Sequence, residues 1–322
     1  MPKVSVVIPA YNCERFIAAA VNSVLGQSYK DYELIVVNDG STDSTENALS
    51  GFRSRITYIS QKNGGPANAR NAGVLAAEGE YVAFLDQDDA WLPDKLGMQV
   101  DLFEKKGSLG LVYADEYMLK DGSFNDYGPG NLRTFQFRPP HRGKVFKYLF
   151  AQNFIPTSSV MARKECFSKV GLFNSALVPI EDYDRWLRIA AFYEVDFIDR
   201  PLVRYRDHAA TFRKDDVRTF TNIVNTLKGV IADYPDLNGL IDRRGRGELS
   251  RFHVILGRRH LRRNDPGKAR ENFKSALKVS GFPSFILYVF VSPAYAHLRG
   301  IFIKLASRVR LRIRHIRRKV NT

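Results

Sequence analysis

Residues 80–91 read Glu-Tyr-Val-Ala-Phe-Leu-Asp-Gln-Asp-Asp-Ala-Trp, and this stretch determines both the expected fold and the expected site. Its apolar run, Tyr81–Leu85, is typical of a strand buried on both faces of a sheet. Three carboxylates follow at once, at Asp86, Asp88 and Asp89. Like charges this close repel one another unless a cation joins them. The stretch therefore predicts a buried strand whose carboxyl end binds a hard divalent metal and a phosphate-bearing ligand.

Strands and helices alternate on both sides of this stretch, through the first half of the chain. Short apolar runs predict strands, and amphipathic segments that begin with Ser, Thr or Pro predict helices. Such alternation indicates an α/β fold with a mostly parallel, Rossmann-like sheet between helices. The expected strands are Val4–Ile8, Tyr32–Val37, Arg55–Ile59, Tyr81–Leu85 and Gly110–Tyr117, and the expected helices are Glu14–Leu25, Asp43–Leu49, Pro66–Ala77 and Pro93–Lys105.

The pattern is less regular in the second half. Residues 121–145, rich in Gly and Pro, predict a long irregular segment of the kind that often has a function. Further on, the sequence predicts strands at Thr157–Ala162, Val195–Ile198 and Leu202–Tyr205 and a helix at Asp182–Phe192. From Phe220 only helices are predicted. We therefore expect a first domain at residues 1–215, with halves at 1–118 and 119–215, and an all-helical extension at residues 216–322.

Charge is unevenly distributed along the 322 residues, which carry a net charge of +15. Residues 1–200 contain 22 Lys/Arg and 25 Asp/Glu, a net charge of −3, whereas residues 201–322 contain 27 and 9, a net charge of +18. A basic partner surface is therefore expected in the C-terminal third. The two cysteines, Cys13 and Cys166, are too few for a disulfide framework and predict buried thiols in a reducing compartment.

The N-terminus gives an expectation about location. A strand is predicted from Val4 onward, without the basic and long apolar regions of a signal peptide. No window reaches the roughly 18–20 apolar residues that a spanning helix needs. We expect the protein on the cytoplasmic side.

Polar segments follow four of the predicted strands, where ligands bind in parallel sheets. Tyr11, in the segment Pro9-Ala10-Tyr11-Asn12, could stack on a planar base. Asp39 follows the second strand. The pair Gly64-Gly65 permits close approach to an anion, which Arg70 on the next helix could reach. The fourth segment is the acidic cluster of residues 86–89, and a fifth, Glu181-Asp182-Tyr183-Asp184-Arg185-Trp186, begins a helix.

Each segment also has a purely structural interpretation. Asp39 could cap a turn, Gly64-Gly65 could form only a turn, and Glu181 and Asp182 could only favour a helix N-terminus. The coincidence of four polar strand ends argues against that interpretation for the set. A dinucleotide-binding fold is not favoured, because the first strand lacks a following Gly-x-Gly-x-x-Gly.

Taken in this order, five segments resemble the family-2 inverting glycosyltransferases of the GT-A fold: Val4–Asn12, Glu33–Asp43, Asn63–Gly73, Gly79–Trp91 and Glu181–Trp186. The resemblance covers roughly residues 3–210. It implies a nucleotide-sugar donor, usually a UDP-sugar, and a Mg²⁺ or Mn²⁺ ion.

The resemblance also implies roles for individual residues. Tyr11 and Asp39 would contact the nucleoside, Asp86 would contact the ribose or metal-bound water, Asp88 would ligate the metal, and Asp182 would be the catalytic base. His208 matches a histidine that in many members reaches the diphosphate or metal. The whole set expected to bind the nucleotide-sugar is Pro9, Ala10, Tyr11, Asn12, Asp39, Gly65, Arg70, Asp86 and Gln87. The acceptor is expected to contact Glu181, Asn153 and Trp186.

One departure from the family narrows the expected activity. Processive members carry Gln-x-x-Arg-Trp, whereas Arg185-Trp186 here follow Asp184 without that Gln. We therefore expect non-processive transfer to a lipid-linked or saccharide hydroxyl, in surface polysaccharide or glycolipid biosynthesis. Polyprenyl-phosphate sugar synthases share the N-terminal motifs and remain an alternative. An inactive basic protein that binds membranes or nucleic acid on the same fold is another, although the intact Asp86, Asp88 and Asp182 argue against it.

The C-terminal third suggests a partner surface. Leu249–Arg262 and Pro266–Val279 predict a helical hairpin, and Phe282–Val291 is apolar but too short to span a bilayer. Ile301–Lys319 combines apolar residues at near-helical spacing with many arginines, a pattern that suits an interfacial helix on anionic lipid. A solvated basic tail and nucleic-acid binding are the alternatives, the latter disfavoured. We expect peripheral association with the inner face of the cell membrane.

Overall fold

The structure is a computed structural model that describes residues 1–120, 132–207 and 216–280. Contacts divide the chain into two compact units, residues 1–245 and 246–322. Helix α9 (Asp216–Asp233) begins at the boundary predicted from sequence and lies within the first unit. The domain boundary near residue 215 therefore stays a prediction.

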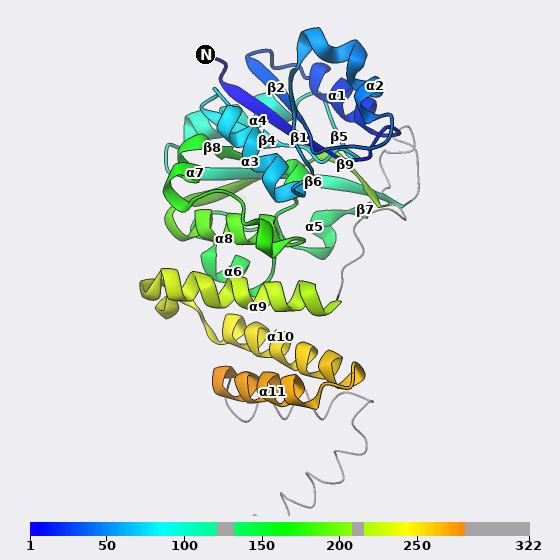
Figure 1. Cartoon of the computed structure of the whole chain (residues 1–322). Coiled ribbons are helices and arrows are strands. Elements are labelled where there is room, and N and C mark those ends of the chain that lie inside the picture. Colours follow the sequence, from blue (N-terminus) through cyan, green and yellow to red (C-terminus); the bar gives the residue numbers. More distant parts are fainter. Residues whose placement is uncertain (121–131, 208–215, 281–322) are drawn as a thin grey trace, which may run out of the picture. The chain divides into compact units, whose positions relative to one another are not determined.

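The first unit is built on one sheet of nine described strands (Figure 1). Along the sheet the strands follow the order β3-β2-β1-β4-β8-β6-β9-β5, and β7 pairs with β6. The strands are β1 (Val4–Ala10), β2 (Tyr32–Asn38), β3 (Thr57–Ser60), β4 (Tyr81–Phe84), β5 (Ala90–Trp91), β6 (Leu109–Lys120), β7 (Leu132–Arg133), β8 (Met161–Arg163) and β9 (Glu194–Asp207).

The predicted α/β class and the parallel N-terminal half of the sheet are confirmed. Strand β1 is parallel to β2 and β4, and β2 is parallel to β3. Strand β8 then pairs antiparallel with both β4 and β6, while β6 and β9 pair parallel. The antiparallel strands β5 and β7 complete the sheet. Strand β9 corrects the prediction of two short strands, because it continues through Arg200-Pro201 as one irregular strand.

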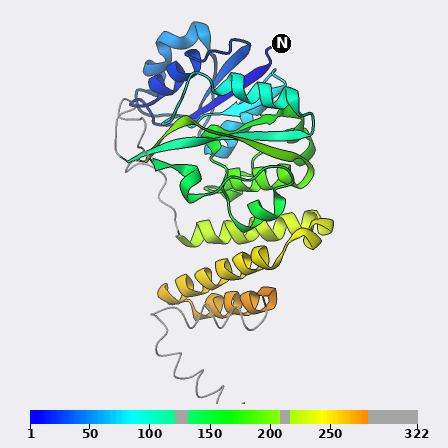
Figure 2. The same cartoon turned by 180° about the vertical axis from the view of Figure 1, so that it is seen from behind.

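Helices cover both faces of this sheet (Figures 1 and 2). The helices of the first unit are α1 (Ile17–Leu25), α2 (Thr45–Leu49), α3 (Pro66–Ala76), α4 (Lys95–Lys105), α5 (Thr134–Phe137), α6 (Phe146–Ala151), α7 (Lys164–Val170), α8 (Glu181–Phe192) and α9, of which α9 packs against α8. Short 3-10 turns are η1 (Ser50–Arg55), η3 (Thr157–Ser159), η4 (Ser175–Leu177) and η5 (Pro235–Leu240). Turn η3 replaces the first half of the strand predicted at Thr157–Ala162.

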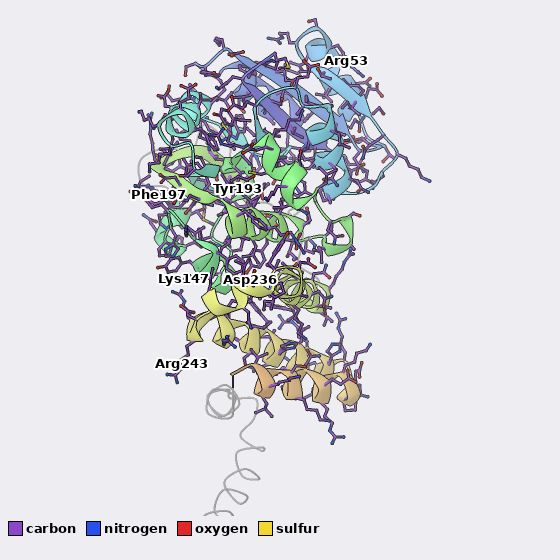
Figure 3. All side chains as sticks on the ribbon, turned by 90° about the vertical axis from the view of Figure 1, so that its left-hand side faces the viewer. Arg53, Lys147, Tyr193, Phe197, Asp236 and Arg243 are labelled. Atoms are coloured by element: carbon purple, nitrogen blue, oxygen red, sulfur yellow. The ribbon has the colours of Figure 1, made fainter. Side chains whose placement is uncertain are left out.

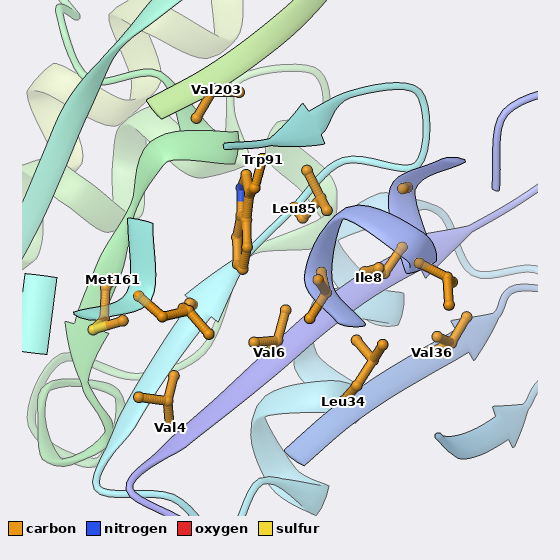
Figure 4. Close-up of a cluster of buried hydrophobic side chains, with 14 of the residues drawn as sticks. Val4, Val6, Ile8, Leu34, Val36, Leu85, Trp91, Met161 and Val203 are labelled. Atoms are coloured by element: carbon orange, nitrogen blue, oxygen red, sulfur yellow. The ribbon is translucent and has the colours of Figure 1, made fainter. Parts of the chain in front are cut away.

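Alternation along β1 assigns its two faces to different helices. Val4, Val6 and Ile8 are buried in a cluster with apolar residues of α1 and α4 and with Trp91 (Figure 4). Val7 points to the other face, where a Cβ on Gly73 of α3 would approach it to 2.3 Å. A glycine is therefore needed for α3 to lie this close to the sheet.

A cluster of aromatic side chains holds helix α5 beside β6. Phe197 of β9 (Figure 3) lies 5.9 Å from Tyr113 of β6 and 5.5 Å from Phe135 of α5, measured between ring centres. These contacts fix the short helix α5 against the middle of β6. Thr134, which begins that helix, is thereby held next to Glu116.

The second unit contains most of α10 (Arg243–Arg262) and α11 (Pro266–Ser280). Val254 and Ala276 are buried between these two helices, and the Ser250 hydroxyl donates to the carbonyl of Ala276 at 3.0 Å. Gly257 allows the ring of Phe273 to approach, since a Cβ there would lie 2.7 Å from it. The predicted hairpin is thus present, and the described part of the extension is helical.

No helix among residues 1–120, 132–207 and 216–280 is both long and apolar enough to cross a bilayer. The predicted interfacial segment at residues 301–319 lies outside the described residues.

Candidate active site

Parallel pairing brings the predicted polar segments to one edge of the sheet. Ala10 at the end of β1 pairs with Asn38 at the end of β2, and Asn38 pairs with Ser60 at the end of β3. Strand β4 ends beside β1, with Phe84 paired to Val7. The turns after these four strands carry Tyr11, Asp39, Gly64-Gly65 and Asp86, so the edge predicted as the ligand site is formed as expected.

Asp39 is buried and organises the glycine turn. Its Oδ1 accepts hydrogen bonds from the Gln61 side chain at 2.7 Å and from the Gly64 N–H at 2.9 Å, and its Oδ2 accepts one from the Gly65 N–H at 2.8 Å. Gly65 has a φ of +84°, which favours glycine. Since each carboxylate oxygen accepts two hydrogen bonds, Oδ2 retains capacity for one donor from a ligand.

The turn after β1 is clamped from both sides. The Gln87 side chain accepts from the Tyr11 N–H at 2.6 Å and donates to the Tyr11 carbonyl at 3.1 Å. On the other side, Asn12 is bonded through its side chain to the Thr42 N–H at 2.8 Å and through its backbone N–H to the Ser41 hydroxyl. Tyr11 remains 43% exposed. The Gln87 amide thus positions Tyr11, and the predicted contact of Gln87 with the nucleotide-sugar stays a prediction.

Arg70 joins the two halves of the site. One guanidinium nitrogen donates to Asp86 Oδ1 and another to Glu181 Oε1, both at 2.7 Å. Its side chain is only 7% exposed. Burial lowers the pKa of Arg70, but the charges of Asp86 and Glu181 outweigh burial and raise the pKa above its ordinary value. Arg70 thus pairs carboxylates from α8 and the turn after β4, and its contact with an anion of the ligand stays a prediction.

Asp182 lies next to this network at the start of α8. Its Oδ2 accepts a hydrogen bond from the Thr157 hydroxyl at 2.7 Å, and its Oδ1 accepts one from the Tyr183 N–H at 2.6 Å. Burial and then the charge of Glu181 raise the pKa of Asp182 to about 6, against the opposing effect of the Thr157 hydrogen bond. A carboxylate with a pKa near the working pH suits a general base.

Asp89 has a structural role within the acidic cluster. Its Oδ2 accepts from the Ser158 hydroxyl at 2.5 Å, and its Oδ1 accepts from the Arg206 N–H at 3.0 Å. Burial, and then the charges of Asp88 and Asp86, raise the pKa of Asp89 well above its ordinary value. Asp89 therefore ties turn η3 and strand β9 to the end of β4, and it directly precedes β5.

Asp88 and Asp86 remain as the partly exposed oxygen donors of the cluster. No group of three His, Cys, Asp or Glu side chains within the described residues is arranged to hold a metal by itself. Carboxylate oxygens in this small number nevertheless fit Mg²⁺ or Mn²⁺, because such ions bind through one or two carboxylates and complete their shell with phosphates and water. His208, the other predicted ligand, lies outside the described residues.

The three predicted acceptor residues have different surroundings. Trp186 is fully buried between Phe84 and Phe173, so its side chain is part of the core and has no surface for an acceptor. Glu181 is buried against Arg70 and positions its neighbours. Asn153 is partly exposed, and its side chain accepts from the Ile155 N–H at 3.2 Å.

Two residues of the site, Thr157 and Ser158, were not predicted from the sequence. Thr157 and Ser158 hold Asp182 and Asp89, and Ser158 also accepts from the N–H of Asp86 at 3.1 Å. Consecutive hydroxyl residues after Pro156, in a segment otherwise resembling a strand, were the available signal.

A hollow of about 550 Å³ lies beside Lys3, Glu80 and Arg163 at the opposite edge of the sheet, away from the residues of the candidate site.

Replacing Arg70 by leucine is expected to reduce the free energy of unfolding by about 3–5 kcal/mol, since it leaves Glu181 buried without its cation. Denaturant titration of the full chain measures this change. The matched control is Arg200→Leu, which removes an exposed pair with Asp94 and should cost about 1 kcal/mol or less. Equal losses in both variants would contradict a structural role for the Arg70 network.

Comparison with known sequences gives a consistent set of relatives. The sequence model described as glycosyl transferase family 2 matches residues 5–171. The amylovoran biosynthesis glycosyltransferase AmsB of Erwinia amylovora is 32% identical over 215 residues, which are 62% of this chain and 68% of that protein. The uncharacterized glycosyltransferase RC0461 of Rickettsia conorii is also 32% identical, over 64% of this chain but only 34% of that protein. The chain thus spans about a third of some relatives.

Solved structures share the fold. S. aureus TarS 1-349 in complex with UDP-GlcNAc superposes with a TM-score of 0.57 at 16% identity, covering 86% of this chain and 92% of that one. The mannosyltransferase PcManGT of Pyrobaculum calidifontis, in complex with GDP-Man and Mn²⁺, gives a TM-score of 0.59 at 18% identity, covering 92% and 83%. At these identities the likeness concerns the fold alone.

Proposed function

Because the chain belongs to glycosyl transferase family 2, we propose that it is an inverting, non-processive enzyme that transfers a sugar from a nucleotide-sugar to a hydroxyl acceptor. A UDP-sugar is the proposed donor, and the acceptor is a lipid-linked or free saccharide. Support for the nucleotide comes from TarS, which has been solved with UDP and UDP-GlcNAc. AmsB, a relative that covers a comparable length, is named for amylovoran biosynthesis, which supports a role in surface polysaccharide assembly.

The observation that carries the proposal is the position of Arg70. By pairing with Asp86 and Glu181 at 2.7 Å each, it brings the start of α8 against the turn after β4. Asp182 thereby lies near the acidic turn although 94 residues separate it from Asp88 in sequence. A base opposite a diphosphate-binding turn is the arrangement that an in-line displacement at an anomeric carbon requires.

Each of these residues has a proposed role in donor binding or in the transfer reaction. The free capacity of Asp39 Oδ2 would accept a hydrogen bond from the base of the nucleotide, and the ring of exposed Tyr11 would stack on it. Asp88, helped by Asp86, would hold Mg²⁺ or Mn²⁺, which neutralises charge on the leaving diphosphate when bound. Asp182 would take the proton of the acceptor hydroxyl as that oxygen attacks, so that one displacement inverts the anomeric configuration.

Binding of UDP and Mn²⁺ tests the proposed donor class directly. At a UDP concentration 100 times its Kd, the folded state should gain about 2.7 kcal/mol, seen as a higher melting temperature than with Mn²⁺ alone. Adenosine diphosphate with Mn²⁺ is the control for diphosphate binding without a uracil base. The proposal would be contradicted if neither UDP nor GDP, each tested with Mn²⁺, raised the melting temperature.

We further propose that the enzyme works on the cytoplasmic face of the membrane, held there by the C-terminal tail. Residues 281–322 contain nine Lys/Arg and no Asp or Glu, and each basic residue near an anionic surface contributes about 1 kcal/mol. A chain that ends at residue 281 is expected to lose co-flotation with vesicles of phosphatidylglycerol and phosphatidylcholine. Vesicles of phosphatidylcholine alone are the control, and unchanged flotation of the shortened chain would refute the anchor.

A further inference from the structure

We propose that Glu116 of β6 is a sugar-binding residue of this site, whose free carboxyl oxygen takes a hydrogen bond from a saccharide hydroxyl. The proposal rests on the proposed function, because it needs a saccharide in the site. The hydroxyl belongs either to the transferred sugar or to the acceptor, which share this chemistry.

Glu116 is buried, at 6% exposure, but only half of its carboxyl group is used by the protein. Its Oε1 accepts a hydrogen bond from the Thr134 hydroxyl at 2.9 Å, whereas Oε2 is buried and has no partner among the described residues. A buried carboxyl oxygen without a donor is costly. Such an atom is retained more readily where a ligand supplies the missing donor.

The adjacent carboxylate shows that the fold can satisfy an acid at this place. Asp115 Oδ1 accepts from the N–H groups of Glu116 and Phe135, at 2.8 and 2.9 Å, and its Oδ2 accepts from Arg133 Nε at 2.5 Å. Each oxygen of Asp115 thus has at least one donor within the protein. The incomplete bonding of Glu116 therefore does not follow from a lack of donors at this place in the fold.

The strand itself is irregular at this position. The β6–β9 register shifts between Ala114 and Asp115 and again between Asp115 and Glu116. Irregularities of this kind change the direction of a side chain and occur often beside active sites. Beyond the shift, Glu116 pairs with Val203, which in turn pairs with Trp91 at the end of the acidic stretch.

Charges connect Glu116 to the acidic turn. Burial raises the pKa of Glu116 to about 7, and the charges of Asp115 and Asp86 raise it as well, while the Thr134 hydrogen bond and the charge of exposed Arg138 oppose them. The charge of Glu116 in turn contributes to the raised pKa of Asp89. Glu116 therefore lies within electrostatic range of the turn that is proposed to bind the donor.

The test compares Glu116→Gln with Thr134→Val in the full chain. Glu116→Gln keeps one oxygen to accept from Thr134 and replaces the other by an NH2 group. Thr134→Val removes only the hydrogen bond from Thr134 to Glu116. For each variant we measure the Kd of UDP, the Kd of the donor, the KM of the acceptor and the melting temperature. The donor is the one that the wild type cleaves fastest among UDP-GlcNAc, UDP-glucose, UDP-galactose and GDP-mannose.

Glu116→Gln is expected to leave UDP binding and the melting temperature unchanged and to weaken sugar binding roughly 10-fold to 100-fold, as loss of a hydrogen bond to a charged group does. A higher donor Kd identifies the transferred sugar as the partner, and a higher acceptor KM identifies the acceptor. Thr134→Val should retain most of both affinities.

Two results would overturn the proposal. One is unchanged donor and acceptor binding in Glu116→Gln, and the other is an equal loss in Thr134→Val, which would mean that both residues only shape α5. Failure of the proposed function has a different signature, because the wild-type protein itself would then bind neither UDP nor GDP.

Discussion

Asp88→Ala is expected to lower glycosyl transfer by about 10³-fold or more, because a bound metal contributes several kcal/mol to stabilising the leaving diphosphate. Asp88 is partly exposed and lies in a cluster where its charge raises the pKa of buried Asp89. The substitution therefore removes a repulsion at the same time as the metal ligand. We expect the variant to stay folded and to lose the Mn²⁺-dependent part of UDP binding.

Transfer assays with Mn²⁺ varied from micromolar to millimolar concentration measure this effect. The control is Asp94→Ala, which removes an exposed carboxylate six residues further along the chain that pairs with Arg200 and accepts from the Ser28 hydroxyl. That variant should transfer at the wild-type rate. Transfer by Asp88→Ala at the wild-type rate would show that Asp88 does not hold a metal needed for the reaction.

Asp182→Asn is expected to lower kcat by about 10²–10⁴-fold, the usual contribution of a general base. Asparagine has the size of aspartate and retains an oxygen for the Thr157 hydroxyl, which bonds the carboxylate at 2.7 Å. Binding of UDP should therefore be unchanged. Isothermal titration with UDP, beside single-turnover transfer, separates the two quantities, and normal transfer would place the base elsewhere.

The same carboxylate predicts a pH dependence. The base must be ionised to accept a proton, and the pKa of Asp182 is raised to about 6. The value of kcat/KM should thus be level above that pH and fall about tenfold per pH unit below it. Thr157 donates to the ionised form and so lowers the pKa, and Thr157→Val is expected to move the acidic limb to higher pH. A limb that stays in place would exclude Asp182 as the titrating group.

Strands with continuous apolar sequence were predictable from the sequence. Val4–Ala10, Tyr32–Asn38 and Tyr81–Phe84 are buried and paired as expected, because a buried parallel strand needs little besides apolar side chains. The errors fall where polar side chains bond locally. The Ser159 hydroxyl donates to the Pro156 carbonyl, and this contact closes turn η3 in place of a strand.

The sheet edge proposed to bear the site was also predictable. The alternation of strands and helices along the chain implies parallel strands, whose carboxyl ends lie at one edge of the sheet. The partners of individual residues were not predictable. Arg70 meets Glu181 across 111 residues of sequence, and Gln87 meets Tyr11 across 76. Trp186 follows a motif arginine and yet belongs to the core. Whether such a side chain binds a ligand or makes contacts inside the protein depends on its tertiary neighbours. Spacing and composition do not identify those neighbours.

The most direct test of the account is cleavage of nucleotide-sugars by the full chain. Release of nucleoside diphosphate from UDP-GlcNAc, UDP-glucose, UDP-galactose and GDP-mannose is measured with Mn²⁺, for the wild type and for Asp182→Asn. We predict that the wild type releases diphosphate from at least one UDP-sugar, and that Asp182→Asn binds UDP equally but releases at least about 100-fold less. Release from none of the three UDP-sugars by the wild type, or equal release by the variant, would contradict the account.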